Sequence, residues 1–381
     1  MRFNPIGSES KGGSATAPGV RHLYVHIPFC LQVCPYCSFY KEASDRHKTQ
    51  PFLDALLAEL QLLDLDLRCE TIFFGGGTPT ALSLTQLDYL LSGLRRCLDL
   101  SAVREWTFEM NPATVSRDKA RLLLGHGVNR ISMGVQSFDA GLLKTLGRVH
   151  SVDQVLRSYE ILRQAGFHNV NLDFIFGVPG QTLSQWQDTL AEALRLRPEH
   201  LSAYCLTYEE DTAYFEKLKS GEFRQDTDQD ADFFEATMET LGQAGYDQYE
   251  ISNFALPGYE CAHNVAYWLG EDYAGLGPSA YSTIGACRWQ NVCSTADYIA
   301  QIQQGRPPRT NEESLSPRTK TAERLAFGLR TKWGVPEREL AGLVPDLSAM
   351  LDEGHLERSG DRIRLTVRGR LVADSVAELL V

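Results

Sequence analysis

The amino-acid sequence predicts an α/β fold in which parallel strands alternate with helices, arranged as a (β/α) barrel. Six runs rich in β-branched and aromatic residues alternate with helix-like stretches between residues 22 and 205. Such alternation favours parallel strands joined by right-handed helical crossovers. Glycines or unusual polar groups accompany all six runs, mostly at the carboxyl ends, where the catalytic groups of such barrels gather. An open Rossmann-like sheet predicts the same alternation, but a single phosphate loop would not need functional groups from six strands.

The six expected strands follow one another with a helix-like stretch in each interval. They cover residues 22–27, 71–74, 106–110, 130–135, 169–176 and 200–205. The helix-like stretch 83–98 opens with Ser83, and Gln86 three positions later completes a capping-box pattern. The stretch 151–166 closes on Gly166, which is typical of a helix C-cap. The helix boundaries therefore support the alternation.

Beyond about residue 245 the alternation stops, and the sequence predicts a different organisation. Residues 250–282 are aromatic and glycine-rich, and residues 304–317 resemble a linker. Helices are then expected near 318–332, 336–343 and 346–354, before a hairpin that turns at 359–361 and a last helix. This order predicts a small α+β, winged-helix-like domain, for which a packing role against the barrel is the alternative to a binding role. The expected division is a flexible tail (1–20), a barrel (21–249), an intermediate segment and linker (250–310) and a C-terminal domain (311–381).

Composition limits the classes of function. The 381 residues are 43% hydrophobic and 23% charged, with a net charge of -12, which does not favour a nucleic-acid groove. No apolar run approaches the ~18 residues of a membrane span, and the polar, Gly- and Ser-rich start does not resemble a signal peptide. Nine cysteines are scattered along the chain. We therefore expect a cytoplasmic protein whose cysteines are thiols or metal ligands.

The segment "CLQVCPYC" holds three cysteines, Cys30, Cys34 and Cys37, and no fourth. Three thiolates on one loop can hold a [4Fe–4S] cluster through three irons and leave the fourth iron open. S-adenosylmethionine (SAM) can fill that position through its amino and carboxylate groups, and the reduced cluster then generates a 5′-deoxyadenosyl radical. The alternative is a zinc knuckle with a remote fourth ligand.

A glycine-rich stretch, "GGGTPT" (75–80), directly follows the second expected strand. Glycines let the backbone approach a ligand closely, so Gly76 and Gly77 are expected beside the methionine part of SAM. A tight turn would explain such a run equally well if it stood alone. Glu109 can pair with a ribose or an ammonium group, or stand as a solvated strand end. Arg148, taken by itself, is expected to be a charge on a helix surface.

The complete pattern resembles one family. The stretches "YVHIPFC", "GGGTPT", "GVQSFD", "NLDFIFGVPGQT" and "YEISNFA" are similar to those of the coproporphyrinogen-III-oxidase-like branch of radical SAM proteins. The resemblance runs from about residue 22 to the C-terminus. It implies a partial (β/α)6 barrel followed by a helical C-terminal domain.

The resemblance also implies site residues. Cys30, Cys34 and Cys37 match the cluster ligands. Further residues match positions around SAM: Tyr24, Gly77, Thr78 and Glu109 around the iron-bound molecule, and Tyr36, Gln136, Arg148 and Asp173 around the second molecule of the true oxidases. The number of SAM molecules bound here is left open.

Two features separate the oxidases from their relatives. The oxidases carry a further cysteine two residues after the third, where this chain has Phe39, and they have a longer segment before the cluster than the 29 residues present here. The stretch "HNVAYW" (263–268) matches the HNxxYW motif of HemW-type heme chaperones. Its candidate heme-binding residues are His263, Asn264, Tyr267 and Trp268, since histidine ligates heme iron and aromatic rings pack on a porphyrin. The alternative for this stretch is a structural aromatic turn.

The sequence therefore leads to three hypotheses. The favoured one is a heme chaperone that binds a [4Fe–4S] cluster and SAM, carries heme as cargo and delivers it to a membrane-associated respiratory hemoprotein. The second is oxygen-independent oxidation of coproporphyrinogen III, and the third is a radical methyltransferase. A homodimer is compatible with the resemblance. Tyr281 stands where many chaperone relatives carry histidine, which leaves the role of that position open.

Overall fold

The computed structural model describes residues 19–63, 65–344 and 347–380. The predicted N-terminal tail, 1–20, therefore lies outside the described residues except for Gly19 and Val20, which open the first strand. Six parallel strands form the centre of the molecule and confirm the six predicted runs. They are β1 (Gly19–Ile27), β4 (Asp66–Gly76), β5 (Glu105–Met110), β6 (Arg130–Gln136), β7 (Val170–Phe176) and β8 (His200–Cys205).

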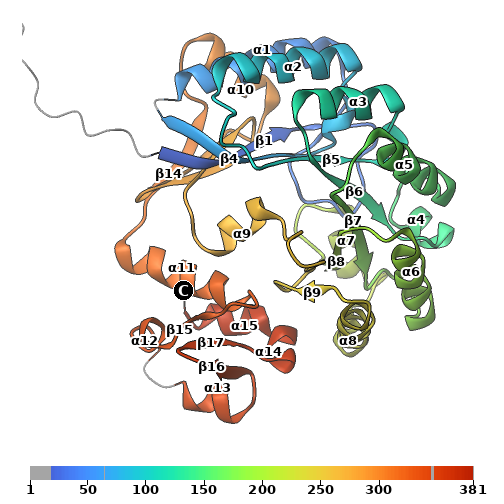
Figure 1. Cartoon of the computed structure of the whole chain (residues 1–381), viewed down its shortest axis with the longest axis vertical. Coiled ribbons are helices and arrows are strands. Elements are labelled where there is room, and N and C mark those ends of the chain that lie inside the picture. The colour runs from blue at the N-terminus through green and yellow to red at the C-terminus, as the bar shows by residue number, and fades with distance from the viewer. Residues whose placement is uncertain (1–18, 64, 345–346, 381) are drawn as a thin grey trace, which may run out of the picture.

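These strands pair in chain order, β1-β4-β5-β6-β7-β8, and every neighbouring pair is parallel. The crossover helices cover the outer face of the curved sheet (Figure 1). They are α1 (Arg46–Leu62), α2 (Leu84–Cys97), α3 (Arg117–His126), α5 (Val152–Ala165), α6 (Leu183–Leu196) and α8 (Thr227–Gln243). Two shorter helices, α4 (Ala140–Thr145) and α7 (Ala213–Lys219), follow β6 and β8.

The predicted capping signals at the helix ends are confirmed. Ser83 and Gln86 form a reciprocal capping box at the start of α2. Gly166 ends α5 with φ 109°, a left-handed conformation that costs glycine little. The main core lies between these helices and the sheet, and it includes Phe74, Trp106, Phe108 and Trp186.

The sheet continues on both sides of the predicted strands. On one side β11 (Tyr273–Leu276) pairs in parallel with β1, and the antiparallel strands β12 (Tyr281–Ile284), β13 (Cys287–Asn291) and β14 (Arg309–Ser314) follow. On the other side β10 (Asn253–Ala255) pairs antiparallel with β8, and β9 (Asp247–Gln248) pairs antiparallel with β10. The expected linker 304–317 is therefore wrong in part, because it contains β14. The helix α10 (Thr295–Gln303) packs on α1.

The C-terminal unit has its own small sheet, ordered β15-β17-β16, and its own core. Its strands are β15 (Val335–Pro336), β16 (Leu356–Ser359) and β17 (Arg362–Leu365), and its helices are α11 (Pro317–Leu329), α12 (Glu337–Leu340), α13 (Ser348–Asp352), α14 (Val367–Leu371) and α15 (Ala373–Glu378). The predicted hairpin turns where expected, with Gly360 at φ 65°. Across the described residues, none of the helices has the length and apolar character needed to cross a membrane.

One helix, α9 (Ala262–Trp268), lies on the inner side of the curved sheet, between the sheet and α11 (Figure 1). It contains the stretch "HNVAYW". This position joins the barrel interior to the C-terminal unit, so the residues of α9 can contribute to a site between the two.

Candidate functional site

The three cysteines of the cluster loop lie on one short segment beyond the end of β1. Cys30 ends the strand β2 (Phe29–Cys30), which pairs with β3 (Glu42–Ala43), and the amide of Ser44 donates to the carbonyl of Cys30 at 2.9 Å. The amide of Cys37 donates to the carbonyl of Cys34 at 3.3 Å, which closes the turn between them. All three are free thiols that are half-buried. The loop is therefore held at its base while its sulfur atoms stay accessible.

One pocket brings most of the predicted site residues together. Its lining includes the three cysteines with Tyr36, Gly76, Gly77, Thr78, Asn111 and Arg148. Thiolates that hold a four-iron cube bind three different irons, so they need not meet around one point, and among the described residues no His, Cys, Asp or Glu trio does so. The donor set, three thiols from one loop, fits such a cluster.

The glycine stretch fixes the first cysteine. The amide of Gly77 donates to the carbonyl of Ile27, and that of Thr78 to the carbonyl of Phe29, each at 2.8 Å. A Cβ on Gly77 would lie 2.7 Å from the backbone oxygen of Pro28, and a Cβ on Gly76, which has φ 103°, would meet the ring of His26 at 2.6 Å. These two positions need glycine because the chain packs against itself there. A bulky residue at Gly77 would therefore displace the cluster loop, whatever it does to SAM.

Arg148 faces the cluster loop instead of forming the helix-surface charge expected from its residue type. Its Nη1 donates to Sγ of Cys34 at 3.5 Å, and its Nη2 donates to the carbonyl of Gly134 at 2.9 Å. Burial lowers the pKa of this guanidinium, but Tyr36 and Cys34 outweigh that effect and raise it, so the positive charge is retained. Burial raises the pKa of the Cys30 thiol to about 11. A bound iron would be needed to ionise that thiol, and Arg148 would favour the anionic site that results.

The residues predicted to hold SAM line the inner face of the neighbouring strands. Tyr24 donates through its hydroxyl to Nδ1 of His26 at 3.1 Å, because Nε2 of His26 donates to the carbonyl of Tyr40 at 2.9 Å. Burial lowers the pKa of His26 to about 4, so this ring is neutral. Glu109 lies beside Tyr24 and Gly75, since a Cβ on that glycine would meet both side chains. Burial, and then the charge of Asp173, raise the pKa of Glu109 to about 8.

The remaining two predicted residues lie at different depths. Gln136 ends β6 in a left-handed conformation with φ 69°, which is uncommon for a non-glycine residue, and its side chain lies near Gly134 and therefore near Arg148. Asp173 sits further inside, where Ser132 donates to it at 3.0 Å and Asn171 at 2.7 Å. The sequence did not single out His26, Ser132 or Asn171. A pattern in the sequence could have identified them, namely polar residues at alternating positions of otherwise apolar strands. Alternate residues of a strand share one face, so this pattern indicates a barrel interior with polar side chains.

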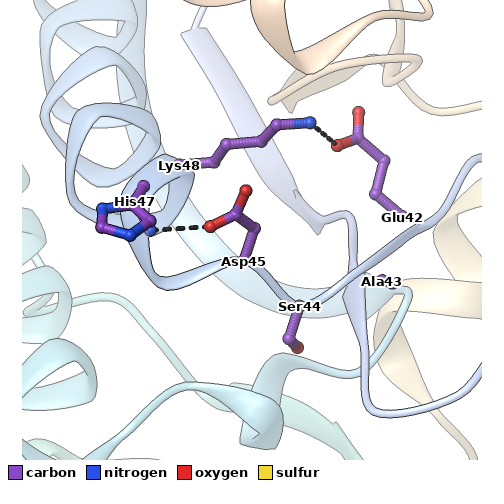
Figure 2. A pocket seen from close by; sticks show the side chains of 6 residues that line it. All are labelled: Glu42, Ala43, Ser44, Asp45, His47 and Lys48. Carbon is purple, nitrogen blue, oxygen red and sulfur yellow. Dashed lines mark hydrogen bonds and ion pairs between the residues drawn. The ribbon is translucent and has the colours of Figure 1, made fainter.

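A shallow hollow beside the cluster loop is lined by six residues: Glu42, Ala43, Ser44, Asp45, His47 and Lys48 (Figure 2). Its polar groups satisfy one another. Lys48 pairs with Glu42 at 3.3 Å, and Asp45 accepts from the amide of His47 at 2.9 Å as the N-cap of α1. These two contacts stabilise the segment that connects the cluster loop to α1.

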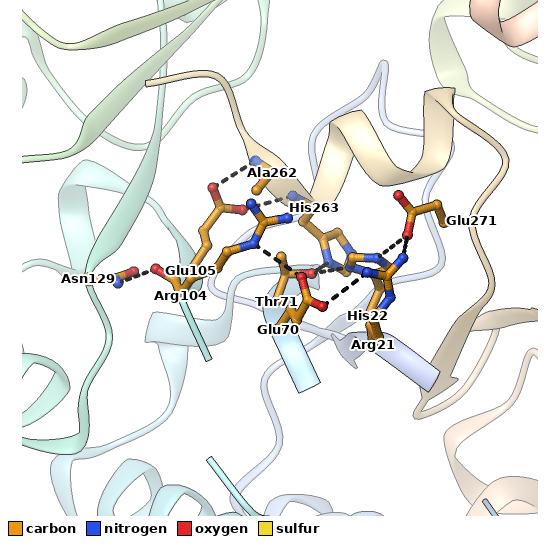
Figure 3. A network of polar contacts seen from close by, with 10 residues as sticks. All are labelled: Arg21, His22, Glu70, Thr71, Arg104, Glu105, Asn129, Ala262, His263 and Glu271. Carbon is orange, nitrogen blue, oxygen red and sulfur yellow. Dashed lines mark hydrogen bonds and ion pairs between the residues drawn. The ribbon is translucent and has the colours of Figure 1, made fainter. Parts of the chain in front are cut away.

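The first turn of α9 is bound to the inner face of β5 and β4 (Figure 3). Glu105 accepts from the amide of Ala262 at 2.8 Å and from that of His263 at 3.0 Å. Two amides at a helix N-terminus are thus satisfied by a buried carboxylate. Glu271, which follows α9, accepts from Arg21 and contacts His22 at 3.1 Å, so both ends of the helix are tied to β1, β4 and β5.

His263 lies in the interior, where 1% of it is exposed. Its Nδ1 lies 2.7 Å from the hydroxyl of Thr71, and its Nε2 lies 2.9 Å from the hydroxyl of Tyr267. The ring stacks on Phe73 with centroids 5.2 Å apart, and burial lowers its pKa to about 3. Both nitrogens are therefore engaged. The expectation that His263 is an axial heme ligand does not fit this arrangement, in which the residue anchors α9.

Asn264, Tyr267 and Trp268 of the motif face another cavity of about 770 Å³, which is larger than the pocket beside the cysteines. All three belong to its lining. So do aromatic side chains from distant parts of the chain and four cations: Phe39, Tyr204, Tyr273, Tyr281 and Phe327, with Arg288, Lys320, Arg324 and Arg330. The cavity thus lies between the barrel, α9 and α11. Phe39, which lines the edge of this cavity, follows Cys37 by two residues, so the cavity adjoins the cluster loop.

The model of the Radical SAM superfamily matches residues 24–193. Among curated relatives, the chain is 38% identical to the heme chaperone HemW of Lactococcus lactis, over 93% of this chain and 96% of the relative. It is 36% identical to HemW of Bacillus subtilis, over 94% and 98%, and 35% identical to HemW of Escherichia coli, over 94% and 97%.

A solved structure supports the same assignment. Coproporphyrinogen III oxidase (HemN) from Escherichia coli, a radical SAM enzyme, superposes with a TM-score of 0.83 at 26% identity, covering 96% of this chain and 90% of that chain. The fold is therefore that of a radical SAM protein along almost the whole chain. With relatives of more than 30% identity matched over nearly their full length, the chain belongs to the HemW family of radical SAM proteins.

Proposed function

We propose that this protein is a heme chaperone that carries heme in the cavity between the barrel and α11. The observation that supports this most strongly is the lining of that cavity. Trp268, Tyr267 and Phe327 supply aromatic surface, and the rings of Trp268 and Phe327 lie edge to face at 6.0 Å. Flat aromatic surface of this kind suits a porphyrin face. The names of the relatives support the same cargo.

The charges of the cavity suit the heme propionates. Arg324 and Arg330 come from α11 and the residue that follows it, and Lys320 comes from the same helix. Arg330 also lies over the ring of Trp268, 5.5 Å from its centroid. Each cation has an acidic partner: Lys320 pairs with Asp272, Arg324 with Glu339 and Arg330 with Asp374. A propionate would exchange one carboxylate partner for another, at little electrostatic cost.

We also propose that the cluster loop holds a [4Fe–4S] cluster through Cys30, Cys34 and Cys37, and that SAM binds beside it. Such a cluster supplies electrons to SAM for radical formation. Gly77 and Thr78 would border the methionine group, and Glu109 would balance its ammonium. Tyr24 and His26 form the wall on the other side. Tyr36, Gln136, Arg148 and Asp173 would border any second molecule.

Oxidation of coproporphyrinogen III is the second candidate, favoured by the likeness to HemN. Phe39 argues against it in our proposal, because this residue occupies the position of the oxidase's additional cysteine. It is 68% exposed at the rim of the aromatic cavity. At this position a bulky apolar side chain can contact bound heme, whereas it cannot supply the thiol that the oxidase has there.

The experiment that tests the proposal uses anaerobically reconstituted full-length protein. Hemin is titrated while the Soret band is followed, and a parallel sample receives coproporphyrinogen III and SAM with a reductant. We expect uptake of one heme per chain and no release of carbon dioxide. Release of carbon dioxide without heme uptake would instead establish the oxidase. We also propose that the protein is a cytoplasmic homodimer that delivers heme to a membrane-associated hemoprotein, and that the chain has the four parts given above.

A further inference from the structure

The heme cavity contains no histidine, cysteine or methionine in its lining, as far as the described residues extend. Two histidines lie against lining residues, and each has both ring nitrogens occupied: His263 by Thr71 and Tyr267, and His22 by Thr71 and Glu271. The side chains that commonly ligate heme iron are histidine, cysteine, methionine and tyrosine, and the amine of Lys320 is held as a cation by Asp272 and the carbonyl of Gly285. Within the cavity this leaves its four tyrosines: Tyr204, Tyr267, Tyr273 and Tyr281.

Three of these phenols are already engaged. The hydroxyl of Tyr267 is bonded to His263, and Tyr273 is hydrogen-bonded to Thr283. Tyr204 is hydrogen-bonded to Ser202 and lies near the carboxylates of Asp173, Glu250 and Glu109, which oppose a second negative charge. A phenolate is therefore disfavoured at each of these positions.

Tyr281 differs from the other three. It opens β12 at the cavity, and 48% of it is exposed. Its hydroxyl makes no hydrogen bond with the part of the chain that the structure describes. An aromatic ring held on a strand, with a free hydroxyl at the mouth of a cavity, can meet a ligand without breaking any contact of the protein.

A cation stands on the neighbouring strand. Thr283 lies two residues along from Tyr281 on the same face of β12, and its register partner on β13 is Arg288. Arg288 donates from Nε to Oγ1 of Thr283 at 3.2 Å, and it lines the same cavity. Glu323 holds this guanidinium in place through Nη1 at 2.9 Å. The face of the sheet that carries Tyr281 therefore also carries a fixed guanidinium, which can offset the charge of an anionic ligand.

We propose that Tyr281 is the axial ligand of ferric heme in this cavity, an inference that rests on the proposed heme-binding function. On binding, the phenol loses its proton to solvent, and a lone pair of Oη forms the bond to ferric iron. No electron is transferred. The hard, anionic oxygen donor matches the ferric state, and Arg288 offsets its charge.

The test compares hemin with protoporphyrin IX, which has no iron, in anaerobic titrations of the reconstituted protein. Tyr281→Phe retains the ring and removes the donor, and Tyr89→Phe, at an exposed tyrosine that is not part of the cavity lining, is the control. We expect Tyr281→Phe to weaken hemin binding by about tenfold or more, the size typical of a lost partner at a metal site. It should also abolish the phenolate-to-iron charge-transfer band. Binding of protoporphyrin IX should stay within about twofold, because the ring contacts remain.

The outcomes distinguish the role of Tyr281 as axial ligand from the proposed heme-binding function. Hemin uptake with the same spectrum in wild type and Tyr281→Phe would overturn Tyr281 as ligand and leave the chaperone proposal standing. Failure of the wild-type protein to bind either porphyrin would overturn the proposed function itself. Tyr281→His covers the case in which Tyr281→Phe does not fold. It should bind hemin with a nitrogen-ligand spectrum in place of the phenolate band, and an unchanged wild-type spectrum would reject the ligand.

Discussion

Nη1 of Arg148 lies 3.5 Å from Sγ of Cys34, which places a guanidinium against one of the three cysteines of the cluster loop. The same side chain is held from behind by the carbonyl of Gly134. The cation is thus positioned by β6 and not by the loop itself. This contact links the cluster site to the barrel.

Arg148 should tune the reduction potential of the cluster. Reduction adds negative charge, which the guanidinium stabilises, so Arg148→Met should lower the potential. A charge-assisted contact of this kind is worth about 1.5–3 kcal/mol, which corresponds to a shift of roughly 60–130 mV for one electron. Redox titration of the reconstituted protein measures this shift. Arg148→Lys should retain part of the effect, and equal potentials for all three proteins would contradict it.

Serine substitution at each of Cys30, Cys34 and Cys37 should remove the cluster, because a hydroxyl does not replace a thiolate on iron. Iron and acid-labile sulfide are measured after anaerobic reconstitution. Cys97→Ser, at an exposed cysteine away from the loop, is the control and should retain the full iron content. A triple variant that keeps its iron would reject the cluster assignment.

Glu109 should make the stability of the SAM-free protein fall as pH rises. Its carboxyl has a pKa of about 8 in the folded state against 4.5 for the free side chain. Between these values the folded state binds more protons than the unfolded state, so folding loses free energy as pH increases and the loss is complete above about pH 8. Glu109→Gln should therefore be more stable than wild type at pH 9, by about 1–3 kcal/mol, with little difference at pH 4.5. Urea unfolding at the two pH values checks this, and a pH-independent difference would contradict it.

His263 should act as a structural anchor. His263→Ala removes two side-chain hydrogen bonds and a ring stack, so it should lower the free energy of unfolding by about 2–4 kcal/mol at pH 7.5. The folded pKa of about 3 lies below the unfolded value of 6.5. The stabilisation is therefore complete above pH 6.5 and declines as pH falls toward 3, and the effect of the substitution should shrink with it.

The control for His263 is Asn264→Ala, one position along on α9 and in the cavity lining. It should change stability by less than His263→Ala. Both variants should keep their iron. Loss of the hemin spectrum in His263→Ala, with melting behaviour unchanged, would restore the histidine as an iron ligand.

The barrel could be predicted from the sequence because each of its strands has a recognisable local pattern of residues. Each of the six runs is rich in β-branched and aromatic residues, and capping residues such as Ser83 and Gly166 mark the helix ends. The strand β11 was missed because the helix before it, α9, lies on the inner side of the sheet and does not form an outer crossover, so the local βαβ pattern is lost. Strand β14 was taken for linker because most of its side chains are exposed and polar.

The grouping of the three cysteines was predictable for a related reason, namely that they are close in sequence. The role of Arg148 was not, because a charge at the end of a short helix usually faces solvent. The burial of His263 depends on Thr71 and Glu105, which lie far earlier in the chain. The aromatic cavity brings together Phe39, Trp268 and Phe327, which are far apart in the sequence. No local sequence pattern predicts that these three side chains lie close together.

The central claim is that heme binds against Trp268 in the cavity beside α11. Anaerobic equilibrium titration of hemin into wild type, Trp268→Ala and Trp333→Ala tests it most directly, since Trp333 is an exposed tryptophan that is not part of the cavity lining. We predict one heme per chain for wild type and for Trp333→Ala, and an affinity about tenfold lower for Trp268→Ala, from the loss of about 1.5 kcal/mol of ring stacking. Equal affinities for all three proteins would contradict the account.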